Sequence, residues 1–374
     1  MKLTINKNTI NKILKITNSI ISNYNINPLL DNFLLIAEQN TLTVICGNQN
    51  NDKLKFVIRE GFEIIKEGKI LLKSKILSKI VTNLKNEKIV LEKVEENTLK
   101  INNSTFEAEI VLLKTNEYFD YQFNLSEEEN VFNLSYDQIQ IIIDKMSHAI
   151  LVNNNLTNSV MNNIHFLSDV DNKKLKLSAT DGFKISFLEL DFDVNLNLDF
   201  IINIEILKRV MNLSSKNSDI RMSIKENNVY FEFDGILIFS SLVVGQFPNV
   251  ENFFINNPII NFSIDKNELL NSLEKGSIFV IKEDTPIVDI TIEKNQMIIN
   301  FKSLEIGSSV ETLNIKNHIG DRIKILLNVN YLSSILKAFE NDIVKFEIES
   351  YIKPIIIKDE KNISFKQLIS PIRY

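Results

Sequence analysis

The sequence has no tryptophan, one cysteine and only nine glycines and six prolines among 374 residues. The single cysteine, Cys46, excludes an internal disulfide, which fits a reducing compartment such as the cytoplasm. With so few glycines and prolines, most of the chain is expected in regular helices and strands. The three histidines, His148, His165 and His318, have no cysteine or carboxylate partner at the spacing that metal sites use.

Other absences exclude whole classes of function. The sequence has no glycine-rich phosphate loop and no nucleophile elbow, and the Asp169–Asp171 and Asp191–Asp193 pairs lack the other ligands of a calcium loop. No apolar run approaches the ~18 residues that span a bilayer, and residues 1–6 lack the apolar core of a signal peptide. We therefore expect a cytoplasmic protein that is not an enzyme, uses no cofactor and contacts no membrane. A hydrolase or nuclease on a repeated scaffold is the alternative, and it would need a carboxylate or histidine cluster.

What the chain does have is a pattern that occurs six times. Two apolar residues lie five positions apart, with a short and mostly polar stretch between them, and successive copies begin 62 to 68 residues apart. The copies are Ile5–Ile10, Leu72–Leu77, Leu134–Ile139, Ile202–Leu207, Ile264–Leu269 and Leu327–Leu332. Strand-cap-helix units are common, but six at near-constant spacing indicate duplication, with two copies forming a unit of about 130 residues.

Each copy predicts the same local structure. A strand-like run comes before it, and apolar residues at helical spacing follow, as at Ile10, Ile13 and Leu14. The residue after the first apolar anchor is, in all copies but the Lys73 copy, a good helix N-cap: Asn6, Ser135, Asn203, Asp265 and Asn328. We therefore expect six strands that each end at a cap and continue into an amphipathic helix of about three turns.

The segments between the copies alternate polar and apolar residues, as in Leu99–Phe106 and Asn228–Phe233, and predict antiparallel strands. The fold class expected is α+β, with three similar domains at residues 1–127, 128–255 and 256–374. Each is large enough to bury its own core.

The formal charge of −6 argues against a protein that coats nucleic acid, but a polyanion responds only to the face presented to it. Basic residues recur on the predicted helices, and we take six as candidates for facing DNA: Lys12, Lys15, Lys75, Lys79, Lys208 and Arg209. The alternative is that these are ordinary solvated helix faces.

Three short motifs occur in a characteristic order along the chain. They are Ser178–Ile185, which turns through Asp-Gly, then Val244–Asn249, and then Ser370–Tyr374 at the end of the chain. Together, on a chain of three units, they resemble the β subunit of bacterial DNA polymerase III, the sliding clamp. The resemblance covers the whole chain and is strongest in its middle and last thirds.

The resemblance implies three clamp domains, each of two strand-helix halves, and a head-to-tail homodimeric ring with sheets outside and helices lining a hole. Such a ring would encircle double-stranded DNA as a processivity factor. Its partners would be the α subunit of the replicative polymerase, the clamp loader and other proteins with clamp-binding motifs. The alternative is a divergent relative that serves only as an interaction scaffold, because Tyr24, Asn203–Glu205 and Ser159–Val160 stand where the family often has basic residues.

The resemblance also assigns sites. It places a peptide-binding pocket at Met161, Thr180, Gly182, Phe183, Ile185, Pro248, Phe253, Asn328, Tyr331, Ile352, Pro354, Leu368, Ser370, Ile372 and Arg373. Ser370 stands where the family usually has a bulky apolar residue. It places the dimer interface at Ile278 and Phe279, with Phe106 on the partner strand.

Overall fold

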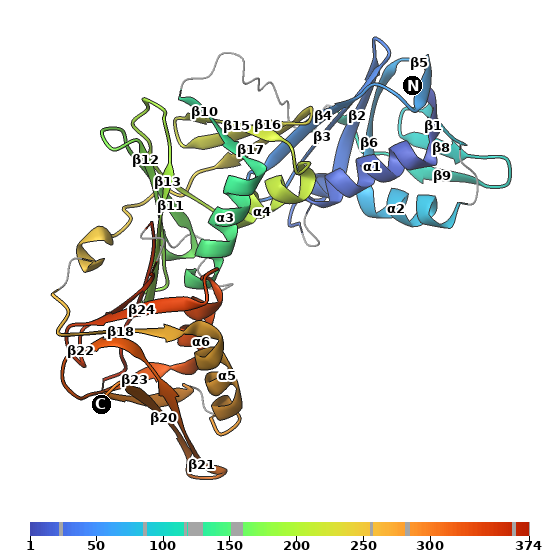
Figure 1. Ribbon diagram of the computed structural model, residues 1–374. Helices are drawn as coiled ribbons and strands as arrows, with labels where there is room; N and C mark the ends of the chain where they lie inside the picture. Colours follow the sequence, from blue (N-terminus) through green and yellow to red (C-terminus); the bar gives the residue numbers. More distant parts are fainter. Residues whose placement is uncertain are drawn as a thin grey trace. The chain divides into compact units, whose positions relative to one another are not determined.

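The computed structural model describes residues 1–21, 25–84, 88–115, 118, 130–150, 160–254, 257–280, 285–360 and 364–373. These residues form two compact units (Figure 1). The first comprises residues 1–139 and 205–242, and the second comprises residues 140–204 and 243–374. The domain borders expected after residues 127 and 255 lie outside the described residues, as do Tyr24, Ser159 and Tyr374.

All six copies of the repeat fold as strand followed by helix. The strands are β1 (Lys2–Asn6), β6 (Gly68–Lys73), β10 (Val131–Ser135), β14 (Asp199–Ile202), β18 (Ile260–Asp265) and β23 (Ile323–Asn328). The helices are α1 (Lys7–Asn18), α2 (Ser74–Asn83), α3 (Tyr136–Met146), α4 (Ile204–Leu213), α5 (Lys266–Ser277) and α6 (Val329–Lys337). Every one of the apolar anchors is at most 2% exposed. Each pair therefore fastens the end of a strand and the first turn of a helix to the same core.

The expected caps are confirmed at three of the copies. Ser135 accepts from the backbone N–H of Gln138 at 3.2 Å while the Gln138 amide accepts from the N–H of Ser135, a capping box. Asp265 accepts from two N–H groups of the first turn of α5, and Asn328 from one in α6. The prediction is wrong for Asn6, whose side chain makes no cap hydrogen bond. In that copy the anchors Ile5 and Ile10 are nevertheless buried, as in the other copies.

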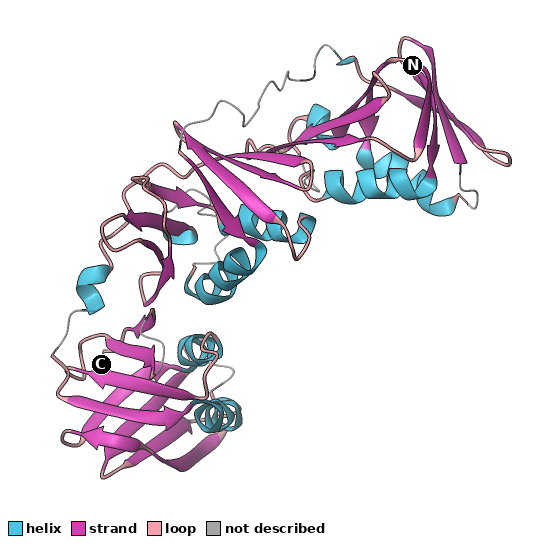
Figure 2. Ribbon diagram, turned by 45° about the horizontal axis from the view of Figure 1, so that its top comes forward, coloured by secondary structure: helices cyan, strands magenta, loops and turns pink. Residues whose placement is uncertain are grey.

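The first unit holds two antiparallel sheets. One runs in the order β5 (Phe62–Lys66), β1, β7 (Lys88–Glu95), β8 (Thr98–Asn102) and β9 (Glu107–Val111). The other runs in the order β10, β15 (Asp219–Lys225), β16 (Asn228–Phe233), β17 (Ile236–Ser241), β4 (Lys53–Ile58), β3 (Thr41–Gly47), β2 (Asn32–Glu38) and β6. Helices α1 and α2 lie side by side (Figure 2), and the short helix η1 (Pro28–Asp31) leads into β2.

The second unit also holds two antiparallel sheets. One runs in the order β14, β11 (Ile164–Asp169), β12 (Lys174–Thr180), β13 (Lys184–Asp191), β26 (Phe365–Ile369), β25 (Ile355–Asp359), β24 (Ile343–Ile348), β18 and β22 (Lys316–Ile319). The other runs in the order β21 (Gly307–Asn314), β20 (Gln296–Ser303), β19 (Ile287–Glu293) and β23. The short helices are η4 (Ser147–Ala149), η5 (Val160–Asn162) and η6 (Glu251–Phe254).

The α+β class is confirmed, and the strand expected at Asn228–Phe233 is β16. The strand expected over Leu99–Phe106 is wrong in its second half. There β8 ends at Asn102, because the Asn103 side chain accepts from the N–H groups of Thr105 and Phe106 and turns the chain.

Two strand pairs join distant parts of the chain within single sheets. In the first unit β17 pairs with β4, which we call the N-terminal seam, and in the second unit β13 pairs with β26, the C-terminal seam. The residues expected as the central domain contribute strands to sheets of both compact units. This is why the compact units do not coincide with thirds of the chain.

Candidate functional site

The Asp-Gly turn between β12 and β13 is tightly hydrogen bonded. The Thr180 hydroxyl accepts from Gly182 N–H at 3.1 Å and donates to the Lys184 carbonyl at 2.8 Å. Asp181 Oδ1 accepts from the N–H groups of Phe183 and Lys184 at 2.9 and 2.8 Å. Gly182 has φ +90°, a conformation that L side chains rarely adopt. The turn therefore holds Phe183 outward, and its side chain is 58% exposed.

Phe183 lies where three segments of the chain meet. Its ring stacks on Tyr331 at the start of α6, with centroids 6.0 Å apart. Its carbonyl accepts from Ser370 N–H, just beyond β26, at 2.9 Å. Asn328 caps the helix that carries Tyr331 by accepting from the Tyr331 N–H at 3.1 Å. The predicted residues Phe183, Asn328, Tyr331 and Ser370 are thus placed together, and with Gly182 we call them the Phe183 surface.

A buried cluster supports this surface from the seam. Ile185 on β13 pairs with Leu368 on β26, and both pack with Phe187 and Val250. Half-buried Phe247 and Phe254 cover the same cluster. Ile185 and Leu368 are therefore core residues beneath the surface, and their exposed faces are small.

The remaining predicted pocket residues surround this centre to different degrees. Met161 lies against the turn, with its sulfur 4.0 Å from where a Cβ on Gly182 would stand. Ile372 N–H donates to the Leu326 carbonyl, which ties the C-terminal segment to β23. The others are exposed or half-buried, with Phe253 in η6 and the rest in loops: Pro248, Phe253, Ile352, Pro354 and Arg373.

Sequence reasoning missed a polar network behind the seam. The Gln367 amide donates to Ser186 Oγ at 2.9 Å, and its oxygen lies 3.0 Å from His148 Nε2. Ser186 donates in turn to the Lys145 carbonyl. Burial lowers the pKa of His148 to about 4, so the imidazole is neutral at pH 7. No sequence signal links Ser186 with Gln367, because 181 residues separate them.

The residues expected at the dimer interface lie near two sheet edges. β9 is an edge strand of the first unit, and Phe106, just before it, is exposed. β21 is an edge strand of the second unit, and the Phe279 ring lies 3.9 Å from where a Cβ on its first residue, Gly307, would stand. Ile278, at the end of α5, is exposed.

The basic residues expected to face DNA divide into two groups. Lys12 and Lys15 on α1 and Lys75 and Lys79 on α2 are exposed. Lys208 pairs with Glu205 at 2.8 Å, and Arg209 pairs with Asp52, whose side chain is only 9% exposed. The Arg209 guanidinium is thus engaged inside its own unit, which argues against its proposed role in binding DNA.

Over the described ranges no group of three or more His, Cys, Asp or Glu side chains is placed to hold a metal. In the same part of the chain no helix is long and apolar enough to cross a membrane.

Comparison with known proteins agrees with this geometry. Family models of the DNA polymerase III beta subunit match in chain order: the N-terminal domain at residues 1–122, the central domain at 133–249 and the C-terminal domain at 256–373. The beta sliding clamp of Mycoplasma genitalium is 26% identical over the full length of both chains. The beta subunit structure from Streptococcus pyogenes superposes with a TM-score of 0.90 at 20% identity, and covers both chains fully. The Pseudomonas aeruginosa clamp, solved with bound griselimycin, gives 0.88 at 18% identity, also over both full chains.

A chain of three matched domains with this fold is a sliding clamp. It belongs to the family of the DNA polymerase III beta subunit, and it is a processivity factor of DNA polymerase rather than an enzyme. The expectation of a non-enzymatic clamp is confirmed, and the hydrolase or nuclease alternative is excluded.

Proposed function

We propose that two copies of the chain close head to tail into a ring around duplex DNA in the cytoplasm, and that the Phe183 surface captures short peptides of replication proteins. Each copy would contribute three domains to this ring, at residues 1–127, 128–255 and 256–374. The peptides would come from the polymerase α subunit, the clamp loader and other proteins with clamp-binding motifs. Tethering in this way raises the local concentration of polymerase at the primer end.

The observation that carries the peptide proposal is an exposed aromatic ring on a rigid turn. Phe183 stacks on Tyr331 and stands beside the C-terminal segment, so an apolar anchor of an extended peptide could pack against both rings. Sites of this kind are mostly apolar, with few polar groups to fix orientation. Griselimycin binding by the Pseudomonas aeruginosa clamp is consistent with ligand capture in this family.

The ring proposal is supported by the edges of β9 and β21. Unpaired edge strands readily pair with another chain, and both edges carry exposed apolar side chains, Val111 on β9 and Val310 on β21. A head-to-tail contact closes with two copies only if each first unit meets the other copy's second unit. The exposed lysines of α2 could then attract phosphates without reading sequence.

Retention on DNA tests the ring. Clamp loaded on a closed circular duplex should remain through gel filtration and be lost once the circle is linearised, and its mass in solution should be twice that of one chain. Ile278→Asp should give a monomer that is not retained. Ile65→Asp, at the opposite edge of the sheet that ends in β9, is the control and should remain dimeric. Equal retention on circular and linear DNA would rule out topological linkage.

Peptide binding tests the Phe183 surface. Phe183→Asp places a charge where an apolar anchor should pack, and we expect at least about tenfold weaker binding of a polymerase-derived clamp-binding peptide. Ile65→Asp is again a matched control, because its side chain is 56% exposed against 58% for Phe183. Calorimetric titration with the peptide should show weaker binding for Phe183→Asp but not for Ile65→Asp. Both variants should still be dimeric. Unchanged affinity in Phe183→Asp would refute the assignment.

A further inference from the structure

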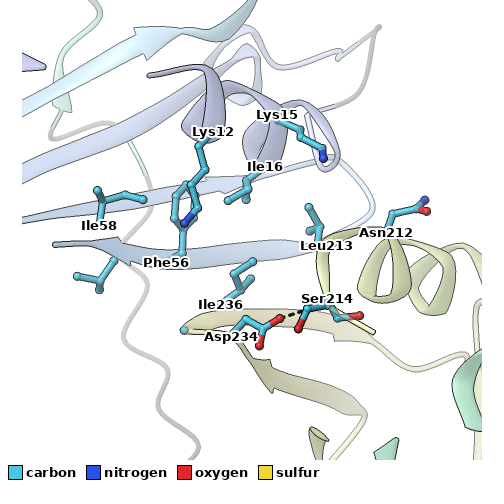
Figure 3. A pocket seen from close by; sticks show the side chains of 13 residues that line it. Lys12, Lys15, Ile16, Phe56, Ile58, Asn212, Leu213, Ser214, Asp234 and Ile236 are labelled. Carbon is cyan, nitrogen blue, oxygen red and sulfur yellow. Dashed lines mark hydrogen bonds between the residues drawn. The ribbon is translucent and has the colours of Figure 1, made fainter. Parts of the chain in front are cut away.

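A cavity of about 340 Å³ lies within the first unit beside the N-terminal seam (Figure 3). At this end β4 extends two residues beyond its last pair with β17, although the two strands are equally long. The last pair of the ladder joins Ile236 of β17 with Phe56 of β4. Beyond this pair β4 continues to Ile58, whereas the segment before β17 turns away through Asp234–Gly235. A Cβ added at Gly235 would meet no atom within 4 Å, so this wall of the cavity is open.

The floor of the cavity is apolar and mostly aliphatic. Ile16 from α1, Phe56 and Ile58 from β4 and Ile236 from β17 line it, and each is buried. Leu213, at the end of α4, is half-buried on the adjoining side. An aliphatic side chain entering here would leave water for an apolar surface that is already formed.

The walls carry charges of opposite sign. Lys12 and Lys15 reach the cavity from α1, both are exposed, and within the described ranges neither makes an ion pair or a hydrogen bond. On the other side Asp234 Oδ2 accepts from Ser215 N–H at 2.9 Å and from Ser218 Oγ at 2.6 Å, which fixes the carboxylate. The cavity therefore offers two free ammonium groups, one positioned acceptor and an apolar floor.

These features favour a peptide over nucleic acid. A carboxylate on the ligand would meet the two lysines, and a peptide N–H could donate to Asp234, whereas a phosphate chain would face that carboxylate with like charge. Bases bind by stacking on exposed rings, but Phe56, the one ring among the described residues that line the cavity, is only 3% exposed. The volume also falls within the usual range for ligand pockets, about 300–1,000 Å³.

We propose that this cavity is a second docking site, distinct from the Phe183 surface, for a partner peptide in which an aliphatic side chain stands beside an acidic one. The aliphatic side chain would occupy the floor formed by Ile16, Ile58 and Ile236. The acidic side chain would lie between Lys12 and Lys15. A partner with both motifs could engage the same subunit twice, which would raise its overall affinity.

The test uses acetylated and amidated hexapeptides that place Leu, Ile or Val beside Asp or Glu. Fluorescence anisotropy should show saturable binding to full-length Phe183→Asp protein, in which the first peptide surface is disabled. Matched peptides with Lys in place of the acidic residue should not bind. Because the assay is run without the Phe183 surface, its failure is independent of the peptide proposal made above. Absence of binding by all of the acidic peptides would overturn the second site.

Two variants then locate the binding. Lys12→Glu combined with Lys15→Glu should weaken it at least about tenfold, whereas the same charge change at exposed Lys66 and Lys69 should not. Leu213→Trp, which fills the cavity and keeps both lysines, should also abolish binding. Unchanged affinity in both variants would refute the site. Displacement of the peptide by a short single-stranded oligonucleotide at lower concentration would assign the cavity to nucleic acid instead.

Discussion

Each seam is entered through an Asp-Gly turn, but the two turns differ in backbone conformation and the seams present different surfaces. Asp181–Gly182 turns into β13 at the C-terminal seam, and Asp234–Gly235 turns into β17 at the N-terminal seam. At the first turn the pairing continues, because Ser370 N–H donates to the Phe183 carbonyl and the ring is displayed. At the second turn the ladder stops at Ile236, and a cavity takes the place of the missing pairs. The same repeated architecture thus yields an exposed anchor in one unit and a recess in the other.

The seams also differ in the polar groups that hold them. At the N-terminal seam, Asp52 accepts from Ser240 on β17 and from Asn48, and it pairs with Arg209 of α4. At the C-terminal seam, Gln367 links Ser186 with His148, and Lys184 at the start of β13 forms a buried ion pair with Asp181 at 3.2 Å. Duplication accounts for the shared strand pairing, whereas the polar side chains that link the paired strands differ between the two seams. Both seams therefore hold an ion pair with a buried carboxylate, and the C-terminal seam adds a histidine that stays neutral.

The largest effect is expected from breaking the polar network of the N-terminal seam. Asp52→Ala should cost about 3–5 kcal/mol in the free energy of unfolding, because it leaves the Arg209 guanidinium and the Ser240 hydroxyl without their acceptor. Urea unfolding followed by circular dichroism measures this cost. The control is Asp191→Ala in the exposed Lys174–Asp191 pair, for which we expect about 0–1 kcal/mol. Equal costs would mean that the buried pair contributes no more than a surface pair.

The stability of the C-terminal seam should instead depend on pH. The folded pKa of His148 is about 4, mainly because of burial, and lies below the unfolded value of about 6.5. Between these values the unfolded chain binds a proton that the folded chain excludes. The free energy of unfolding should therefore fall as the pH falls through this window, by at most about 3 kcal/mol.

Removing the imidazole tests this dependence directly. In His148→Gln the loss of stability between pH 6.5 and pH 4 should be smaller than in the wild type by that amount, as measured by urea unfolding at a series of pH values. In Asp52→Asn, at the other seam, His148 should still make its contribution to the slope of the free energy of unfolding against pH. Identical slopes in the wild type and His148→Gln would show that other groups control the acid response.

The six strand-helix copies were predictable because their signal is local. Two apolar anchors such as Leu134 and Ile139 lie five residues apart, and both must be buried for a strand to lead into a helix. The pairs β17–β4 and β13–β26 were not predictable, since strand partners in different thirds of the chain leave no local pattern. The same reason hid the acceptor of Arg209, which is why a basic residue on a helix looked free to meet DNA. Phe183 and the C-terminal residues were found only through the family motifs.

The smallest expected effect distinguishes the copies from one another. Ser135→Ala removes a capping box and should cost about 1 kcal/mol, whereas Asn6→Ala removes a side chain that caps nothing and should cost only a few tenths. Asp265→Ala, which loses two hydrogen bonds at α5, provides a second member of the first class. Urea unfolding of the three variants can resolve this difference. If Asn6→Ala proves as costly as Ser135→Ala, then the polar residue acts through the junction itself and not through the cap.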